Sequence, residues 1–191
     1  MTRDWDRHYR GRTAADARAA SVLCDNAHLL PTRGRALDLA CGLGGNALML
    51  ARSGLETLAW DRARSAIEAL AAQARSEHLP LTAEVRDVVE APPEPARFDV
   101  IVVSHFLERS LAPALIAALR PSGLLFYQTF TRSRVNDRGP GDDRFRLADG
   151  ELLALFAALR VVFYRDEGRI GGLTQGLRDE AQLVACRIPH T

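Results

Sequence analysis

The chain has 191 residues, close to the length of one domain and long enough to bury a hydrophobic core. Hydrophobic residues make up 47% and charged residues 26%, and the 25 basic residues nearly balance the 24 acidic ones. All of the basic residues are arginine. The lack of lysine excludes P-loop proteins, protein kinases and pyridoxal-phosphate enzymes, each of which needs one. We attribute the arginine bias to the codon usage of a GC-rich genome, and the alternative is selection for bidentate binding of an anion.

The same composition limits the partners and the compartment. A net charge of +1 argues against a large nucleic-acid footprint. Three widely spaced cysteines (Cys24, Cys41 and Cys186) and the absence of H-E-x-x-H indicate neither a disulfide framework nor a zinc site. The charged N-terminus lacks an apolar signal region, and no apolar run is long enough to span a membrane. We expect a cytoplasmic protein that binds neither membranes nor nucleic acid, and we expect no metal site.

Periodicity predicts an N-terminal helical segment and then alternating strands and helices. The Ala-rich stretch Thr13–Leu30 is predicted to form one helix, which ends at Pro31 and Gly34. Strands are predicted at Arg35–Ala40, Glu56–Trp60, Leu81–Val85, Phe98–Ser104 and Gly123–Thr129. Helices are predicted at Gly45–Ser53, Arg64–Ser76 and Pro113–Leu119, and from a cap at Asp149 through Leu159.

The C-terminal part departs from this alternation. Two strand-like runs, Val161–Tyr164 and Ala181–Cys186, have only a loop between them, so they must pair antiparallel or lie apart. The pattern describes an α/β fold with an open, doubly wound, mostly parallel seven-stranded sheet and an antiparallel C-terminal hairpin. We expect one domain over residues 1–191, with a lid and helix in residues 1–30 and the core sheet in residues 35–187.

A glycine-rich turn follows the first predicted strand, with the sequence DLACGLGGN from Asp38 to Asn46. Glycines there let the backbone approach a ligand closely, and the following helix offers free N–H groups. The segment GLGGNA also fits G-x-G-x-x-A, so an NAD(P)-dependent oxidoreductase must be considered. Asp38 disfavours that class, because a carboxylate there would repel a pyrophosphate but suits an ammonium or sulfonium group.

Two more aspartates end the next predicted strands. Asp61 lies nineteen residues after Gly42, where an acid can accept hydrogen bonds from both hydroxyls of a ribose. Asp87 follows the third strand, where a carboxylate can accept from an adenine amino group. Together with Asp38 they would share the crevice in which such sheets bind ligands. The alternative is three unrelated aspartates that begin loops.

These residues resemble the class I S-adenosylmethionine-dependent methyltransferases. LDLACGLGG resembles their glycine motif, LAWD their ribose-binding acid and VRDV their adenine-side acid, and FDVIVVS and LRPSGLLFY resemble their fourth and fifth strands. The resemblance covers residues 35–187, with Ala40 where the family usually has glycine. It implies a methyltransferase with S-adenosyl-L-methionine as cofactor and S-adenosyl-L-homocysteine as product. The cofactor-binding residues it implies are Trp5, Tyr9, Asp38, Cys41, Gly42, Gly44, Asn46, Asp61, Arg62, Asp87, Val88 and Ser104.

Within this class the chain most resembles the small bacterial tellurite-resistance-type methyltransferases. WDRHY near the start is similar to their N-terminal lid, and FRLADGELLALF is similar to a helix that they carry. Trp5 and Tyr9, four residues apart, share a helix face and could close over a sulfonium or anchor the N-terminal segment. Unlike members of that group, the chain has no histidine between Arg165 and Glu180.

The acceptor implied is a small molecule. A soft nucleophile such as a chalcogen oxyanion or a thiol can react without a general base, whereas a hydroxyl or an amine needs a proton acceptor. His105, directly after the fourth predicted strand, is the candidate catalytic residue, and a structural role is the alternative. The loop Thr131–Arg146 contains five arginines, which could attract an anion or form a solvated surface. A non-catalytic nucleotide-binding module is the alternative to an enzyme.

Overall fold

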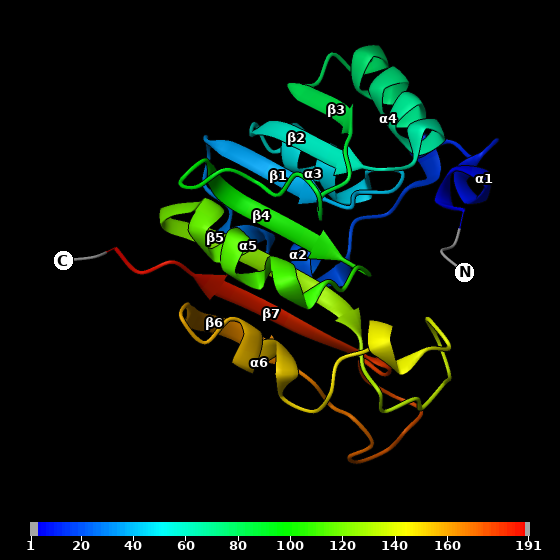
Figure 1. The fold of residues 1–191 in the computed structure, drawn as a ribbon, viewed down its shortest axis with the longest axis vertical. Helices are drawn as coiled ribbons and strands as arrows, with labels where there is room; N and C mark the ends of the chain where they lie inside the picture. Colours follow the sequence, from blue (N-terminus) through cyan, green and yellow to red (C-terminus); the bar gives the residue numbers. More distant parts are fainter. Residues whose placement is uncertain (1–3, 190–191) are drawn as a thin grey trace.

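One seven-stranded sheet dominates the computed structural model, which describes residues 4–189 (Figure 1). The strands lie in the order β3-β2-β1-β4-β5-β7-β6, and only β7 runs antiparallel to its neighbours. Their bounds are β1 Arg35–Leu39, β2 Glu56–Asp61, β3 Leu81–Val85, β4 Phe98–Ser104, β5 Leu119–Phe130, β6 Arg160–Arg165 and β7 Glu180–Cys186. The predicted fold class, including the antiparallel C-terminal pair, is confirmed.

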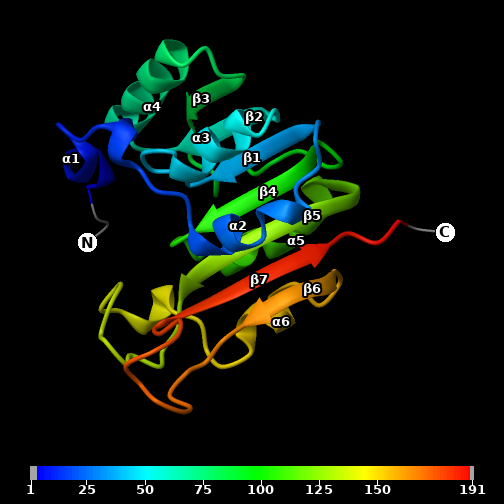
Figure 2. The same cartoon turned by 180° about the vertical axis from the view of Figure 1, so that it is seen from behind.

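Helices cover both faces of the sheet (Figures 1 and 2). One face carries α2 (Ser21–Asp25), α3 (Gly45–Arg52) and α4 (Arg64–Ser76), and the other carries α5 (Ala112–Ala118) and α6 (Glu151–Leu155). Alternate residues of the central strand β4 point to opposite faces. Ile101 and Val103 pack in the core beneath α5 and α6, whereas Val100 and Val102 pack beneath α2 and α3. This burial on both sides explains the continuous apolar run of β4.

The N-terminal segment differs from the prediction of one helix over Thr13–Leu30. It forms a 3-10 turn at Ala14–Asp16, the short helix α2 and a second 3-10 turn at Ala27–Leu29. Ala17 and Ala20 between them are extended. The Ala20 amide donates to Asn46 Oδ1 at 2.8 Å, so contact with α3 prevails over the helix propensity of the alanines.

The predicted bounds are also wrong at β5 and α6. β5 begins at Leu119 rather than Gly123, because Leu119 already pairs with Phe98 across a register shift. α6 begins after Gly150 instead of being capped by Asp149. It ends at Leu155, well before Leu159, and the chain then turns into β6. Both differences arise from pairing or turns that local periodicity does not contain.

Candidate functional site

The glycine turn after β1 curls back toward β2. Ala40, Gly42 and Gly44 all have positive φ angles, +55°, +52° and +77°. The Cys41 amide donates to the Trp60 carbonyl at 3.0 Å, and the Gly44 amide donates to the Cys41 carbonyl at 2.9 Å. Ala40 therefore adopts the left-handed conformation at the position where the resembling family has glycine, a conformation that glycine takes without a Cβ penalty.

Asp61 ends β2 beside this turn and is 9% exposed. Its Oδ2 accepts from the Gly42 amide and its Oδ1 from the Ala63 amide, each at 2.8 Å. An ionised carboxylate has about four acceptor positions, so two remain for further donors such as the hydroxyls of a ribose.

Asp38 lies on β1 and is fully buried. Its two oxygens accept from Asn46 Nδ2 at 3.2 Å and from the Ala47 amide at 3.0 Å. Burial raises the pKa of Asp38 to about 7, although these hydrogen bonds act in the opposite direction. A cation beside Asp38 would stabilise its charged form, which suits the ammonium group of an amino acid moiety.

Asn46 connects Asp38 to the end of β4. Its Nδ2 also donates to Ser104 Oγ at 2.9 Å. Asp38, Asn46 and Ser104 thus form one polar group at the carboxyl ends of the adjacent strands β1 and β4. This is the edge at which open α/β sheets bind ligands.

The N-terminal helix α1 (Trp5–Tyr9) lies over the turn. Asp6 fastens it to α4, since the Ser65 amide donates to Asp6 Oδ1 at 2.7 Å and Ser65 Oγ donates to the Asp6 carbonyl at 2.9 Å. The rings of Trp5 and Tyr9 stack with centroids 6.1 Å apart. A Cβ placed on Gly42 would lie 2.6 Å from the Tyr9 hydroxyl, so the lid and the glycine turn are in contact.

The remaining predicted cofactor residues lie at the same edge of the sheet. Asp87 is half-buried and accepts from the Val89 amide at 3.0 Å, Val88 is buried, and Arg62 is exposed. Burial raises the pKa of the Cys41 thiol well above its usual value, which makes a nucleophilic role for Cys41 unfavourable.

A cavity of about 270 Å³ opens beside Ser104 and His105. It is lined by Arg18, Ala19, Ala20, Ser21, Ser104, His105, Gln128, Arg138, Leu177 and Glu180. His105 follows β4 with φ +53°, and its amide donates to the Gln128 carbonyl at 2.8 Å. Its Nε2 lies 3.2 Å from Glu180 Oε2.

Sequence reasoning missed most of the polar lining. Glu180 is 3% exposed, and Gln128 Nε2 donates to its Oε2. Gln128 Oε1 accepts from the Val22 amide at 2.8 Å, and Gln182 Nε2 donates to Ser21 Oγ at 2.8 Å. A signal was present, because Gln128, Glu180 and Gln182 are polar residues in otherwise apolar strands. Strand pairing joins them, since Gln128 lies opposite Gln182 in the β5–β7 ladder.

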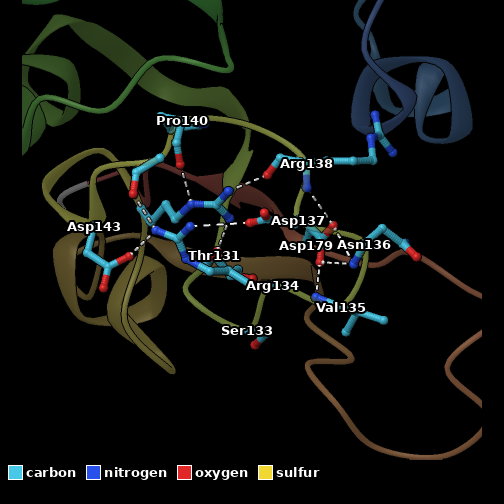
Figure 3. Close-up of polar contacts among 12 residues, drawn as sticks. Thr131, Ser133, Arg134, Val135, Asn136, Asp137, Arg138, Pro140, Asp143 and Asp179 are labelled. Carbon is cyan, nitrogen blue, oxygen red and sulfur yellow. Dashed lines mark hydrogen bonds and ion pairs between the residues drawn. The ribbon is translucent and has the colours of Figure 1, made fainter.

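Most arginines of the loop 131–146 are engaged within the loop itself (Figure 3). Arg146 is fully buried and donates to the carbonyls of Pro140 and Thr131 at 2.6 and 2.7 Å, and to that of Arg138. Arg134 pairs with Asp143 at 2.6 Å, and Arg144 with Asp142. Arg138 differs, because its side chain lines the cavity and lies 3.4 Å from Glu180 Oε1.

The turn and its acids fit S-adenosylmethionine. Gly42 and Gly44 hold the turn in its positive-φ conformation, Asp61 keeps free acceptor positions, and Asp38 suits an ammonium group. Among residues 4–189 no group of three or more His, Cys, Asp or Glu side chains could hold a metal ion. No helix in the same range is long and apolar enough to cross a membrane.

Comparison with known proteins agrees with this geometry. Residues 36–123 match a family described as "Methyltransferase domain". Over 96 residues the chain is 35% identical to a protein of Eikenella corrodens named Hemagglutinin 1, which covers 47% of this chain and 32% of that protein. The chain therefore spans about a third of the length of the curated relative that it matches.

Solved structures share the fold at low identity. TehB from Haemophilus influenzae superposes with a TM-score of 0.74 at 20% identity, covering 88% of this chain and 62% of TehB. A SAM-dependent methyltransferase of Methanosarcina mazei gives 0.67 at 19% identity, covering 91% of this chain and 100% of that one. Geranyl diphosphate C-methyltransferase of Streptomyces coelicolor, in complex with S-adenosyl-L-homocysteine, gives 0.69 at 13%, covering 88% and 77%.

The match of residues 36–123 to a methyltransferase domain supports the expected class I S-adenosylmethionine-dependent methyltransferase, and the solved structures show that the chain shares the fold of such enzymes. This agrees with the resemblance seen in the sequence, and the likeness to TehB is one of fold.

Proposed function

We propose that this protein transfers the methyl group of S-adenosylmethionine to a small-molecule acceptor. The observation that carries the proposal is the position of Ser104, which belongs to two features at once. The Ser104 hydroxyl accepts a hydrogen bond from Asn46, which also donates to Asp38, and Ser104 lines the cavity as well. A donor held at Asp38 and Asp61 and an acceptor held in the cavity would therefore meet at the end of β4.

In this proposal the protein binds and aligns the two molecules. Asp61 and Asp87 accept from the ribose and the adenine, Asp38 faces the ammonium group, and the turn at Gly42 and Gly44 gives the backbone close access. Trp5 and Tyr9 cover the site. Further contacts to the cofactor come from Cys41, Asn46, Arg62, Val88 and Ser104. The cofactor supplies an electrophilic methyl group on a sulfonium, so alignment and exclusion of water are the main tasks of the protein.

The acceptor side favours small polar molecules. The cavity volume of about 270 Å³ suits a small ligand, and Arg18, His105 and Arg138 give its lining a cationic character. Soft nucleophiles such as a chalcogen oxyanion or a thiol fit this description. Where the small molecule loses a proton on methylation, His105 is the residue proposed to take that proton. We propose neither nucleic acid nor a membrane as a partner, and we place the protein in the cytoplasm.

Two alternatives predict different measurements. A non-catalytic module would bind the cofactor without turnover, and an NAD(P)-dependent oxidoreductase would bind NADH instead. The test is transfer of a labelled methyl group from S-adenosylmethionine to a panel of small thiols, phenols, amines and chalcogen oxyanions. We expect label in at least one acceptor, and no label with Asp61→Ala at the same cofactor concentration. Tight cofactor binding without transfer to any acceptor class would support the non-catalytic module.

A further inference from the structure

We infer that Glu180 is a positioning residue that holds His105 as a proton acceptor, so that the acceptor of this enzyme is a hydroxyl, amine or thiol that loses a proton when methylated. The inference deepens the proposed function and rests on it. Among the soft nucleophiles considered above, it favours a thiol, which loses a proton when methylated, over chalcogen nucleophiles that have no proton to lose.

Several contacts fix the imidazole of His105. Nε2 lies 3.2 Å from Glu180 Oε2, and the ring lies against Phe130 with centroids 5.0 Å apart. The His105 backbone has φ +53°, and its amide donates a hydrogen bond to the carbonyl of Gln128 on β5. The side chain nevertheless remains 43% exposed and lines the cavity. This combination of a fixed ring and an accessible edge suits a group that exchanges protons with a ligand.

The partner of His105 is a buried charge. Burial of Glu180 acts to raise its pKa, but hydrogen bonds from His105 and Gln128 and the charge of Arg138 hold this pKa below its usual value. An ionised carboxylate only accepts hydrogen bonds, so the ring must place its proton on Nε2. Nδ1 of neutral His105 then carries a lone pair, and it has no hydrogen-bond partner within the part of the chain that the structure describes.

The other charges around the cavity are two arginines. Arg138 lies 3.4 Å from Glu180 Oε1, and Arg18 lines the same cavity. The backbone of Arg138 is held on both sides, because its amide donates to Asp179 at 3.1 Å and its carbonyl accepts from Arg146 (Figure 3). Glu180 therefore contacts both His105 and Arg138, and it is the one carboxylate among the described residues that line the cavity.

The proton step follows from this arrangement. The heteroatom of the acceptor forms a bond to the methyl carbon, and the carbon–sulfur bond breaks with its electron pair left on sulfur. The proton of the acceptor passes to Nδ1 of His105, and the carboxylate of Glu180 stabilises the imidazolium cation. A dialkyl selenide reacts through a lone pair and releases no proton, so its methylation would not use the pair.

The first test measures the tautomer of His105 directly in the ligand-free protein. Nitrogen-15 NMR of the imidazole rings near pH 8 should show His105 with hydrogen on Nε2 and none on Nδ1. In Glu180→Gln the ratio of the two tautomers should fall about tenfold, because a charge-assisted hydrogen bond is lost. His28 and His78, which do not line the cavity, serve as internal references. A proton on Nδ1 in the parent protein, or an unchanged ratio in the variant, would overturn the inference.

The second test compares acceptors with and without a proton: catechol and 2-mercaptoethanol against dimethyl selenide. For protic acceptors His105→Ala and Glu180→Gln should lower kcat at least tenfold near neutral pH, and activity of Glu180→Gln should recover at higher pH as the acceptor ionises. Turnover of dimethyl selenide should be the same in the parent protein and in both variants. If the variants lose turnover of dimethyl selenide as they lose turnover of the protic acceptors, the inference is contradicted. Calorimetry with S-adenosylhomocysteine separates the proposed function from the role of Glu180. If the parent protein binds S-adenosylhomocysteine but carries the His105 proton on Nδ1, the proposed function stands and the role of Glu180 is refuted.

Discussion

The Gly42 amide donates a hydrogen bond of 2.8 Å to Asp61 Oδ2, which ties the glycine turn after β1 to the acid that ends β2. The same carboxylate accepts from the Ala63 amide just before α4. Asp61 therefore organises two backbone segments and still has acceptor capacity for a ligand. Its place at the carboxyl edge of adjacent parallel strands is where this fold class binds nucleotides.

Replacement of Asp61 tests its role in cofactor binding. Asp61→Ala should weaken the binding of S-adenosylhomocysteine about 100-fold, because hydrogen bonds to a charged acceptor contribute about 1.5–3 kcal/mol each. Calorimetry measures the affinity and circular dichroism checks the fold. The exposed Asp25→Ala is the matched control and should bind as the parent does. Unchanged affinity in Asp61→Ala would refute the assignment of the ribose-binding acid.

The raised pKa of Asp38 predicts a pH dependence of binding. Below pH 7 the free protein holds Asp38 mostly protonated, and an ammonium group placed beside it would favour the ionised form. Binding should therefore release a proton, and the affinity for S-adenosylhomocysteine should rise by up to about tenfold per pH unit until it levels off above pH 7. Calorimetry in buffers of different ionisation enthalpy measures the proton release. Asp38→Asn should abolish the dependence, and a flat profile between pH 5.5 and 8 in the parent protein would contradict the assignment.

A substitution at Gly45 probes how the N-terminal segment packs against α3. A Cβ on Gly45 would lie 2.2 Å from the Arg18 carbonyl oxygen, a backbone atom that cannot swing away. Gly45→Ala should lower the free energy of unfolding by about 1–3 kcal/mol, as overpacking does elsewhere. In Gly141→Ala the new Cβ would meet no atom within 4 Å, so urea unfolding should show little change. Equal stability of the two variants would refute the tight contact.

The loop 131–146 should depend on one buried arginine. Arg146→Met leaves the carbonyls of Thr131, Pro140 and Arg138 without their donor, which should destabilise the protein by several kcal/mol. Hydrogen exchange should show lost protection across the loop. Arg144→Met, which removes only a surface pair with Asp142, should leave exchange and the unfolding midpoint nearly unchanged. Retained protection in Arg146→Met would show that the guanidinium does not organise the loop.

Periodicity alone located the elements that are buried in a regular way. β4 and α4 begin and end where the sequence predicts them, because two-sided burial and an amphipathic pattern are local properties. The predicted bounds of the edge strand β3 are also correct, although none of its residues is fully buried. The prediction of one helix over Thr13–Leu30 was wrong, because the Ala20 amide donates a hydrogen bond to Asn46 Oδ1, 26 positions away in the sequence. No local pattern contains that contact.

The same distinction holds for the site. The residues after β1 and β2 could be chosen from the sequence, because glycines and acids at strand ends follow directly from the fold. Glu180 could not, since a carboxylate at the start of an apolar strand gains meaning only when β7 pairs with β5 and faces His105. The arginines of the loop 131–146 likewise look equivalent in the sequence. Only their contacts separate buried Arg146 from Arg138, which faces the cavity.

The most direct measurement of the central claim is a calorimetric titration of the purified protein with S-adenosylhomocysteine and, separately, with NADH. We expect saturable one-to-one binding of S-adenosylhomocysteine in the micromolar range and no detectable binding of NADH at the same concentrations. Binding of NADH without binding of S-adenosylhomocysteine would contradict this expectation.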